Sequence, residues 1–230
     1  MFPKNLGRMP VSPSTHKLRT CVRSLVAAAL MVAFIVVASA PSPARAIPVA
    51  ERTAAFIAST SRHIALELRR SHDVPEVERQ GVAERQINEV ASLVAYLLDA
   101  DANQLRTVWT AAPMPRKIAL FSALSQVGVP YRTNADAPFI ALDCSALTKF
   151  AWAQAGVPIE RGSQYQYAQA ERVMRDEVQV GDLVWYPGHI MFSLGVPELI
   201  VHARSGQRSV EIHRIDSTRL PWMRWVSPLR

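Results

Sequence analysis

The sequence has little charge and only two cysteines. Charged residues make up 20% of its 230 residues, and apolar residues make up 49%. This composition excludes a disordered or collagen-like chain, and the length suits one ordinary globular domain with an additional segment. No internal repeat or low-complexity tract is present. The sequence therefore indicates a globular protein with a single main domain.

The first 46 residues contain no acidic residue. Six of the 26 Lys and Arg residues lie there, so the rest of the chain has 20 basic against 19 acidic residues. The formal net charge of +7 is therefore concentrated at the N-terminus, and the remainder carries only +1. A nucleic-acid surface needs a clustered excess of cations, which this remainder lacks. We expect no nucleic-acid partner.

No apolar run is long enough for an ordinary membrane-spanning helix. The run at residues 25–38 has 14 residues, whereas a spanning helix needs about 18 or more. Basic residues precede this run, and small residues and prolines follow it as far as Ala46. This order predicts a secretory signal peptide over residues 1–46, cleaved after Ala46, with a retained membrane anchor as the alternative. After cleavage we expect no stable membrane insertion.

Removal of the signal peptide would leave a single cysteine. Cys21 precedes the apolar run and would leave with it, whereas Cys144 would stay. An unpaired cysteine in a secreted chain is either a small buried hydrophobic residue or a reactive thiol. The residues around Cys144 have to decide between these two interpretations.

Residues 47–112 have the pattern of an α-helical N-terminal segment. Apolar residues recur at helical spacing in two groups, which predicts two helices: Ile57, Ile64 and Leu68, then Ile87, Val90, Val94, Leu97 and Leu98. No residues here have catalytic or metal-ligand spacing. The segment is open to three interpretations: an inhibitory cover, an arm that binds a protein partner, or scaffold. The two prolines of residues 111–115 (AAPMP) predict a boundary, so that 113–230 forms the second domain.

The second domain changes from helical to strand patterns along the chain. Helices are predicted at residues 116–127 and 144–155, each followed by a glycine, with a loop at 129–142 between them. Short apolar or alternating runs then predict an antiparallel meander, at residues 182–186, 189–194, 199–203 and 209–215. Helices followed by strands indicate the α+β fold class.

Cys144 falls in the first turn of its predicted helix, with Asp143 as the N-cap residue. Free backbone N–H groups and the helix dipole stabilise a thiolate at this position, so the pKa of Cys144 is predicted to be lowered. The backbone N–H of Cys144 can also supply half of an oxyanion hole. These features favour a reactive thiol over a structural one.

A thiol nucleophile needs a base, and the strand pattern selects among the histidines. His189 begins one predicted strand and His202 lies near the end of the next. If the turn near residues 195–198 has an even number of residues, both side chains lie on one face as direct or diagonal neighbours, roughly 5–8 Å apart. His213 is predicted to face solvent. A zinc site is the rival use of these residues, although no CxxC or HxxxH pair is present.

The stretches VGVPYR, LDCSALTKFAWAQAGVPIERGSQYQ, VQVGDLVWYPGHIMFSLG and LIVHARSG occur in this order within about residues 115–215. Together they resemble the NlpC family of bacterial cell-wall peptidases, which are papain-like cysteine enzymes. The resemblance implies a papain-like core with the nucleophile helix packed on an antiparallel sheet. It also implies roles for six residues: Cys144 as nucleophile, His189 as base, His202 as the third catalytic residue, Tyr131 near the oxyanion site, and Asp143 and Ser145 as substrate-positioning residues.

The resemblance further implies a secreted or cell-wall-associated bacterial endopeptidase that hydrolyses peptidoglycan stem peptides through an acyl-enzyme. The family's commonest target is the bond between D-glutamate and the diamino acid, and no cofactor or metal is expected. The chain departs from the family in its loop at 132–141, and Ala146 replaces a glycine. These departures keep two alternatives open: a cell-wall-binding or regulatory module without turnover, and an acyl transferase.

Overall fold

The structure, a computed structural model, describes residues 48–70, 76–206 and 208–229, with only the backbone of residues 76–83. These residues belong to a compact unit that spans Ala46–Arg230. The predicted signal peptide lies outside the described residues, so that prediction stays untested.

Three helices precede the boundary at residue 112, not the two predicted. They are α1 (Val49–Arg70), α2 (Glu76–Leu98) and α3 (Ala102–Ala111). The side chain of Asp101 caps α3 by accepting hydrogen bonds from the N–H groups of Asn103 and Gln104. The apolar periodicity missed α3 because this short helix buries only two large side chains, Leu105 and Trp109.

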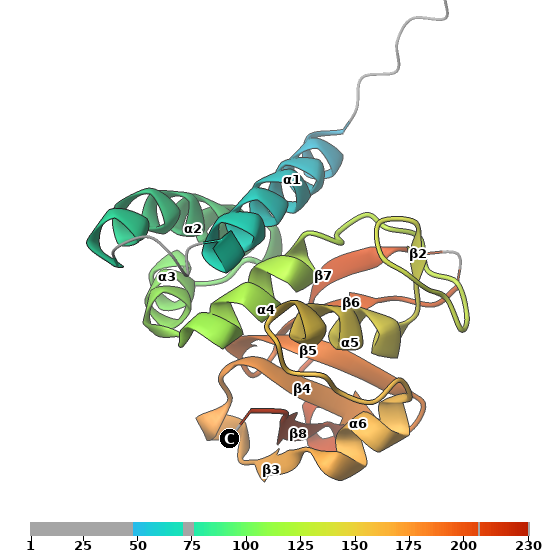
Figure 1. Ribbon diagram of the computed structural model, residues 1–230. Coiled ribbons are helices and arrows are strands. Elements are labelled where there is room, and N and C mark those ends of the chain that lie inside the picture. The colour runs from blue at the N-terminus through green and yellow to red at the C-terminus, as the bar shows by residue number, and fades with distance from the viewer. Residues whose placement is uncertain (1–47, 71–75, 207, 230) are drawn as a thin grey trace, which may run out of the picture. The chain divides into compact units, whose positions relative to one another are not determined.

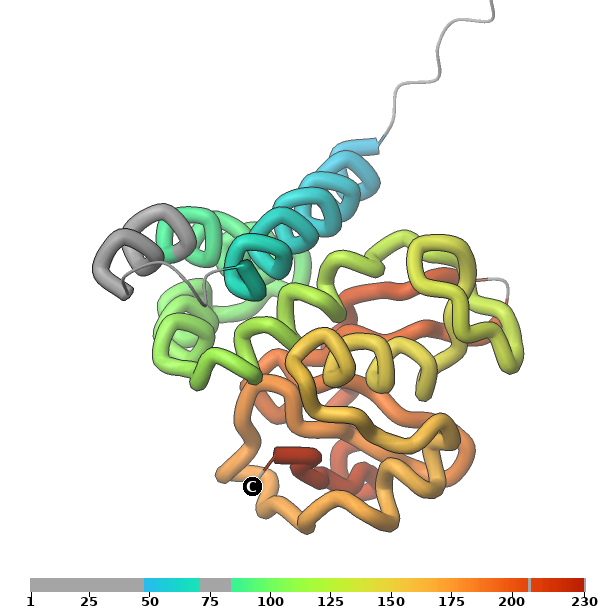
Figure 2. Tube along the Cα trace, in the orientation of Figure 1, coloured from blue at the N-terminus to red at the C-terminus, as the bar shows by residue number. Residues whose placement is uncertain are grey.

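The apolar stripes of the first two helices face the core as predicted. Helix α1 packs against α2 and against α4 (Met114–Leu124), and Figure 2 shows α1 and α2 side by side. Helix α3 is tied to the sheet by Trp109, whose indole N–H donates to the Leu194 carbonyl at 2.8 Å. The buried residues of these helices and of the sheet form one continuous apolar cluster. The helical segment is thus packed onto the rest of the unit.

The sheet has six strands in the order β3-β8-β4-β5-β6-β7, and every neighbouring pair is antiparallel. The four predicted strands are present in sequence as β4 (Val180–Tyr186), β5 (His189–Val196), β6 (Leu199–Ala203) and β7 (Val210–Arg214). Sequence patterns missed β3 (Glu171–Val173) and β8 (Arg224–Ser227), which are too short for a clear alternation. Two two-residue strands, β1 (Asp136–Ala137) and β2 (Ala141–Leu142), pair within the loop that follows α4.

Helices α4 and α5 (Cys144–Gln154) lie across one face of the sheet, as Figure 1 shows. Inward-facing residues of β5, such as Ile190 and Phe192, join their apolar cluster. The opposite face carries a second cluster, to which the segment after β7 contributes Leu220 and Met223. The short helix α6 (Ser163–Gln169) follows α5. The α+β fold with a papain-like core, in which the cysteine helix packs on an antiparallel sheet, is therefore confirmed.

Gly181 allows α5 to approach the sheet closely. Its φ is +88°, and a Cβ atom there would lie 2.7 Å from Cζ2 of Trp152. The Trp152 indole N–H donates to the Gly181 carbonyl at 3.0 Å. Because only glycine fits both this backbone conformation and this contact, Gly181 fixes the distance between the cysteine helix and β4.

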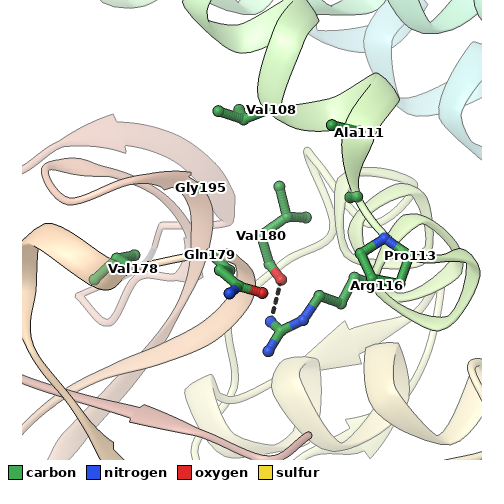
Figure 3. A pocket seen from close by; sticks show the side chains of 9 residues that line it. Val108, Ala111, Pro113, Arg116, Val178, Gln179, Val180 and Gly195 are labelled. Atoms are coloured by element: carbon green, nitrogen blue, oxygen red, sulfur yellow. Dashed lines mark hydrogen bonds between the residues drawn. The ribbon is translucent and has the colours of Figure 1, made fainter. Parts of the chain in front are cut away.

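A buried ion pair fixes α4 on the sheet. The Arg116 guanidinium donates to Asp182 Oδ1 at 2.9 Å and to the Val180 carbonyl at 2.6 Å. It also donates to Ser227 Oγ at 2.9 Å, so α4, β4 and β8 are joined at one point. Arg116 and Val108 both line a pocket of about 320 Å³, and Figure 3 shows these two residues around it. With its charge paired and both terminal nitrogens hydrogen-bonded, Arg116 has a structural role.

Candidate active site

Cys144 begins α5, and Asp143 is its N-cap residue as predicted. Asp143 Oδ1 accepts a hydrogen bond from the Ala146 N–H at 2.8 Å. The thiol is buried, with Cys144 8% exposed. Backbone N–H groups of Ile190, Ser145 and Cys144 itself point at the sulfur. The nucleophile helix thus meets β5 at Ile190, the residue next to His189.

The thiol does not have the lowered pKa that its helix position predicted. Burial raises the pKa of Cys144 above its ordinary value, and the negative charge of Asp143 raises it further. The three backbone N–H groups act in the opposite direction but do not outweigh burial. The prediction was wrong because sequence position gives the helix dipole but not the depth of burial. At neutral pH the sulfur is a protonated thiol and needs a base.

His189 and His202 lie on one face of the sheet, on neighbouring strands. Val196 pairs with Leu199, which leaves a two-residue turn, and Phe192 pairs with Val201, which places His189 diagonally across from His202. Their ring centroids are 5.1 Å apart. His189 Nε2 and His202 Nδ1 share a hydrogen bond of 2.8 Å. The expected even turn and diagonal pairing are confirmed.

Both histidines are neutral at pH 7. Burial lowers the pKa of His189 to about 4, against a smaller opposing effect of Asp143. Burial lowers the pKa of His202 to about 3, with His189 and His213 adding to the effect. If His189 donates from Nε2 to His202, its Nδ1 is free to accept the proton of the thiol. In that tautomer His202 carries its own proton on Nε2.

His213 does not face solvent as the sequence predicted. It is half-buried, and its ring centroid lies 5.7 Å from that of His202. Ile200 pairs with His213, so the side chain shares the face that carries His189 and His202. The prediction failed because the C-terminal segment around Met223 partly covers this face.

Arg161 is a site residue that sequence reasoning missed. Its Nη1 and Nη2 donate to the two carboxylate oxygens of Asp143 at 2.9 and 2.7 Å. Nη1 also donates to Ser145 Oγ at 2.8 Å, and Ser145 Oγ donates to Asp143 Oδ1 at 3.2 Å. The two residues that flank Cys144 are therefore held by one guanidinium. A buried carboxylate needs a cationic partner, but the burial of Asp143 is visible only in the structure, so the sequence carried no signal for Arg161.

Tyr131 lies beside the strand that leads to the nucleophile. It forms a backbone bridge with Leu142, and its N–H donates to the Arg208 carbonyl at 2.8 Å. Figure 2 shows the loop between α4 and α5, in yellow-green, next to β7. Among the described residues, the Tyr131 hydroxyl has no hydrogen-bond partner. The structure thus positions its backbone, and the predicted oxyanion role stays a prediction.

The changed loop at 132–141 contacts the N-terminal helices. Phe139 has a φ of +66°, and its N–H donates to Gln126 Oε1 at 2.8 Å. Its ring packs edge-on against Phe150 of α5 with centroids 5.8 Å apart. The Arg62 guanidinium of α1 lies 4.4 Å from the centroid of the Phe139 ring. Helix α1 therefore touches the loop that precedes the nucleophile.

The described residues offer no group of three or more His, Cys, Asp or Glu side chains that could hold a metal ion. Within the same residues, no helix is both long and apolar enough to cross a membrane.

A buried thiol at a helix N-terminus, with two hydrogen-bonded histidines on adjacent strands, defines a papain-like α+β domain. Residues 128–224 match the model of the NlpC/P60 family. The resemblance seen in the sequence is thereby confirmed. Members of this family are generally peptidases, among them peptidoglycan endopeptidases, and some are non-catalytic.

The chain is 33% identical over 102 residues to dipeptidyl-peptidase 6 of Lysinibacillus sphaericus, covering 44% of this chain and 37% of that protein. It is 31% identical over 133 residues to a probable endopeptidase of Corynebacterium glutamicum, covering 56% of this chain and 62% of that protein. The matches therefore span less than two thirds of either relative. Among solved structures, the chain is 20% identical to a non-catalytic, peptidoglycan-binding NlpC/p60 domain protein of Mycobacterium tuberculosis. The match covers 51% of this chain and 100% of that one, with a TM-score of 0.43.

Proposed function

We propose that the protein is a secreted cysteine endopeptidase that hydrolyses peptidoglycan stem peptides between D-glutamate and the diamino acid. The observation that carries the proposal is the 2.8 Å hydrogen bond between His189 and His202. Ile190, which directly follows His189, points its backbone N–H at the Cys144 sulfur. In this proposal residues 1–46 are the signal peptide, 47–112 the helical segment and 113–230 the peptidase domain.

The proposed reaction begins with transfer of the Cys144 proton to His189 Nδ1. The sulfur attacks the amide carbonyl, and the backbone N–H of Cys144, with Tyr131, stabilises the oxyanion. His189 then gives its proton to the leaving amine, and water hydrolyses the acyl-enzyme. His202 accepts the hydrogen bond from His189 Nε2 and so keeps Nδ1 available as the acceptor.

The thiol is protonated in the resting state, so the reaction needs a neutral base to remove its proton. The paired histidines supply that base. A neutral His189 is available as a base at any pH above about 4. The transfer creates a thiolate and an imidazolium together, and the three backbone N–H groups around the sulfur favour the charged product. Asp143 and Ser145, which Arg161 holds, are proposed to position the substrate beside the thiol.

A non-catalytic cell-wall-binding module is the second candidate. The depth of the Cys144 side chain favours it, because burial reduces access to the sulfur, and the loop at 132–141 departs from the family pattern. An acyl transferase would use the same thiol and base but pass the acyl group to an amine instead of water.

Purified muropeptides incubated with the protein in ¹⁸O-labelled water distinguish the three functions. We expect tandem mass spectrometry to find cleavage after D-glutamate, with one heavy oxygen in the new carboxylate. A product that carries the mass of an added amine instead would establish a transferase. Binding measured by calorimetry without any product would favour the wall-binding module and contradict the endopeptidase.

A further inference from the structure

Helix α1 reaches the β1–β2 hairpin, which directly precedes the nucleophile. The Arg62 guanidinium lies 4.4 Å from the centroid of the ring of Phe139, a residue in the turn of this hairpin. A second contact joins α1 to α5, because Arg69 donates a hydrogen bond to Gln154 Oε1. The helical segment therefore contacts both the hairpin before Cys144 and the helix that begins at Cys144.

Phe139 has a backbone conformation that needs support from its surroundings. Its φ of +66° lies in the left-handed region, which is unfavourable for a bulky aromatic residue. Its N–H donates to Gln126 Oε1, its ring packs edge-on against Phe150, and the Arg62 guanidinium lies over the ring. The Phe139 side chain is 45% exposed, so burial alone does not hold it. Of these three partners, Arg62 is the one that the helical segment contributes.

The hairpin is bonded in turn to the residue before the nucleophile. The carbonyl of Ala135, directly before β1, accepts hydrogen bonds from the Asp143 N–H and from Arg161 Nη2, each at 3.1 Å. Asp136 Oδ2 lies 3.4 Å from Arg161 Nε. Because Arg161 also holds the Asp143 carboxylate, a shift of the hairpin would move the residue that caps the Cys144 helix.

The first turn of α5 acts directly on the thiol. The backbone N–H groups of Cys144 and Ser145 point at the sulfur and favour its charged form, against the effect of burial. Their alignment depends on the position of Asp143, which caps this turn. A loosened hairpin should therefore slow the reaction of the thiol.

We propose that Arg62 is a positioning residue for Cys144: its contact with Phe139 holds the β1–β2 hairpin, which in turn holds Asp143 and the start of α5. Arg62 acts through the hairpin and not through a contact of its own with the sulfur. The helical segment thus assists the reaction and is not an inhibitory cover. The effect on turnover rests on the proposed function, whereas the effect on the thiol does not.

A double-mutant cycle tests this coupling. Arg62→Met keeps an apolar stem and removes the charge, and Phe139→Leu removes the ring. Each should lower kcat for muropeptide cleavage, and the rate of Cys144 alkylation by iodoacetamide, by about two- to fivefold, the range that an exposed cation–π contact supports. KM and the thermal midpoint should change little. The double variant should be no slower than Phe139→Leu alone, because both substitutions break the same contact.

Two further variants serve as rescue and control. Arg62→Lys keeps a cation over the ring and should restore most of both rates. Arg52→Met changes an exposed arginine of the same helix that has no ring contact among the described residues, and it should keep both rates of the original protein. Peptide mapping assigns the alkylated residue, so Cys21 does not contribute to the measured rate.

Additive losses in the double variant, or a lower thermal midpoint without a change in either rate, would overturn the positioning role. Faster cleavage and alkylation in Arg62→Met would also overturn it and would make α1 an inhibitory cover. If none of the proteins cleaves a muropeptide, the endopeptidase proposal fails. The alkylation rates of the four variants then decide by themselves whether Arg62 positions the thiol.

Discussion

Arg161 holds both carboxylate oxygens of Asp143, the residue directly before Cys144, at 2.9 and 2.7 Å. The charge of Asp143 raises the pKa of the thiol, and the positive charge of Arg161 interacts with Cys144 in the opposite direction. This pair therefore holds the residue before the nucleophile in place and adds two opposing charges to the larger effect of burial on the pKa of the thiol.

Replacing Arg161 should slow the reaction of the thiol. Arg161→Met removes the positive charge and leaves Asp143 without its partner, so we expect slower alkylation by iodoacetamide at pH 8. The free energy of unfolding should fall by about 1–3 kcal/mol, the usual cost of a buried polar group that loses its partner. Arg161→Lys is the control, since it keeps the charge but not the two-pronged contact. An unchanged alkylation rate in Arg161→Met would show that the pair does not act on the sulfur.

The pH dependence of alkylation should report a neutral resting thiol. Because burial raises the pKa of Cys144 and lowers that of His189 to about 4, no thiolate–imidazolium pair forms in the free protein at neutral pH. We expect the iodoacetamide rate to increase continuously from pH 6 to above the usual cysteine range. A plateau of high reactivity between pH 5 and 8 would instead indicate a resting ion pair.

His202 should matter through the acceptor that it presents to His189. His189→Ala removes the base and should lower kcat by about 10²- to 10⁴-fold. His202→Leu should lower it less, because the base remains but its tautomer and orientation are free. His202→Asn places an oxygen near the position of Nδ1 and should recover part of the loss. Equal losses in His189→Ala and His202→Leu would contradict an orienting role.

The two histidines should make the protein less stable in acid. Their pKa values of about 4 and about 3 in the folded protein lie below the ordinary value of 6.5. The unfolded chain therefore binds more protons as pH falls below 6.5, and the free energy of unfolding decreases. Between pH 6.5 and its pKa in the folded protein, each histidine lowers the free energy of unfolding by up to about 1.4 kcal/mol for each pH unit of acidification.

Urea unfolding at pH 7.5, 6.0 and 5.0 measures this effect. The free energy of unfolding of His202→Leu should depend less steeply on pH than that of the original protein, because one of the two histidine contributions is removed. An identical dependence in both proteins would show that His202 is not buried in its neutral form.

Much of the site follows from local sequence rules. Asp143 as a helix cap places Cys144 at the start of α5, and the even turn after Val196 keeps His189 and His202 on one face. A register shift between Ser193 and Val196, which the sequence pattern did not predict, then makes them diagonal neighbours. The helix cap and the even turn both depend on spacing along the chain, which the sequence contains. The strands β4–β7 were found for the same reason.

The features that the sequence patterns did not predict depend on contacts between distant segments of the chain. Arg161 meets Asp143 across 18 positions from a loop without periodicity. The raised pKa of the Cys144 thiol and the partial burial of His213 result from packing that only the folded chain provides. Helix α3 was missed because two buried side chains are too few to define a period.

The most direct test of the account is mass spectrometry of purified muropeptides after incubation with the protein, beside the same protein carrying Cys144→Ala. The substitution removes one buried sulfur, so the thermal midpoint should stay within a few degrees, which verifies that the variant is folded. The account predicts cleavage between D-glutamate and the diamino acid by the original protein and none by Cys144→Ala. Cleavage by both proteins, or by neither, would contradict a thiol endopeptidase centred on Cys144.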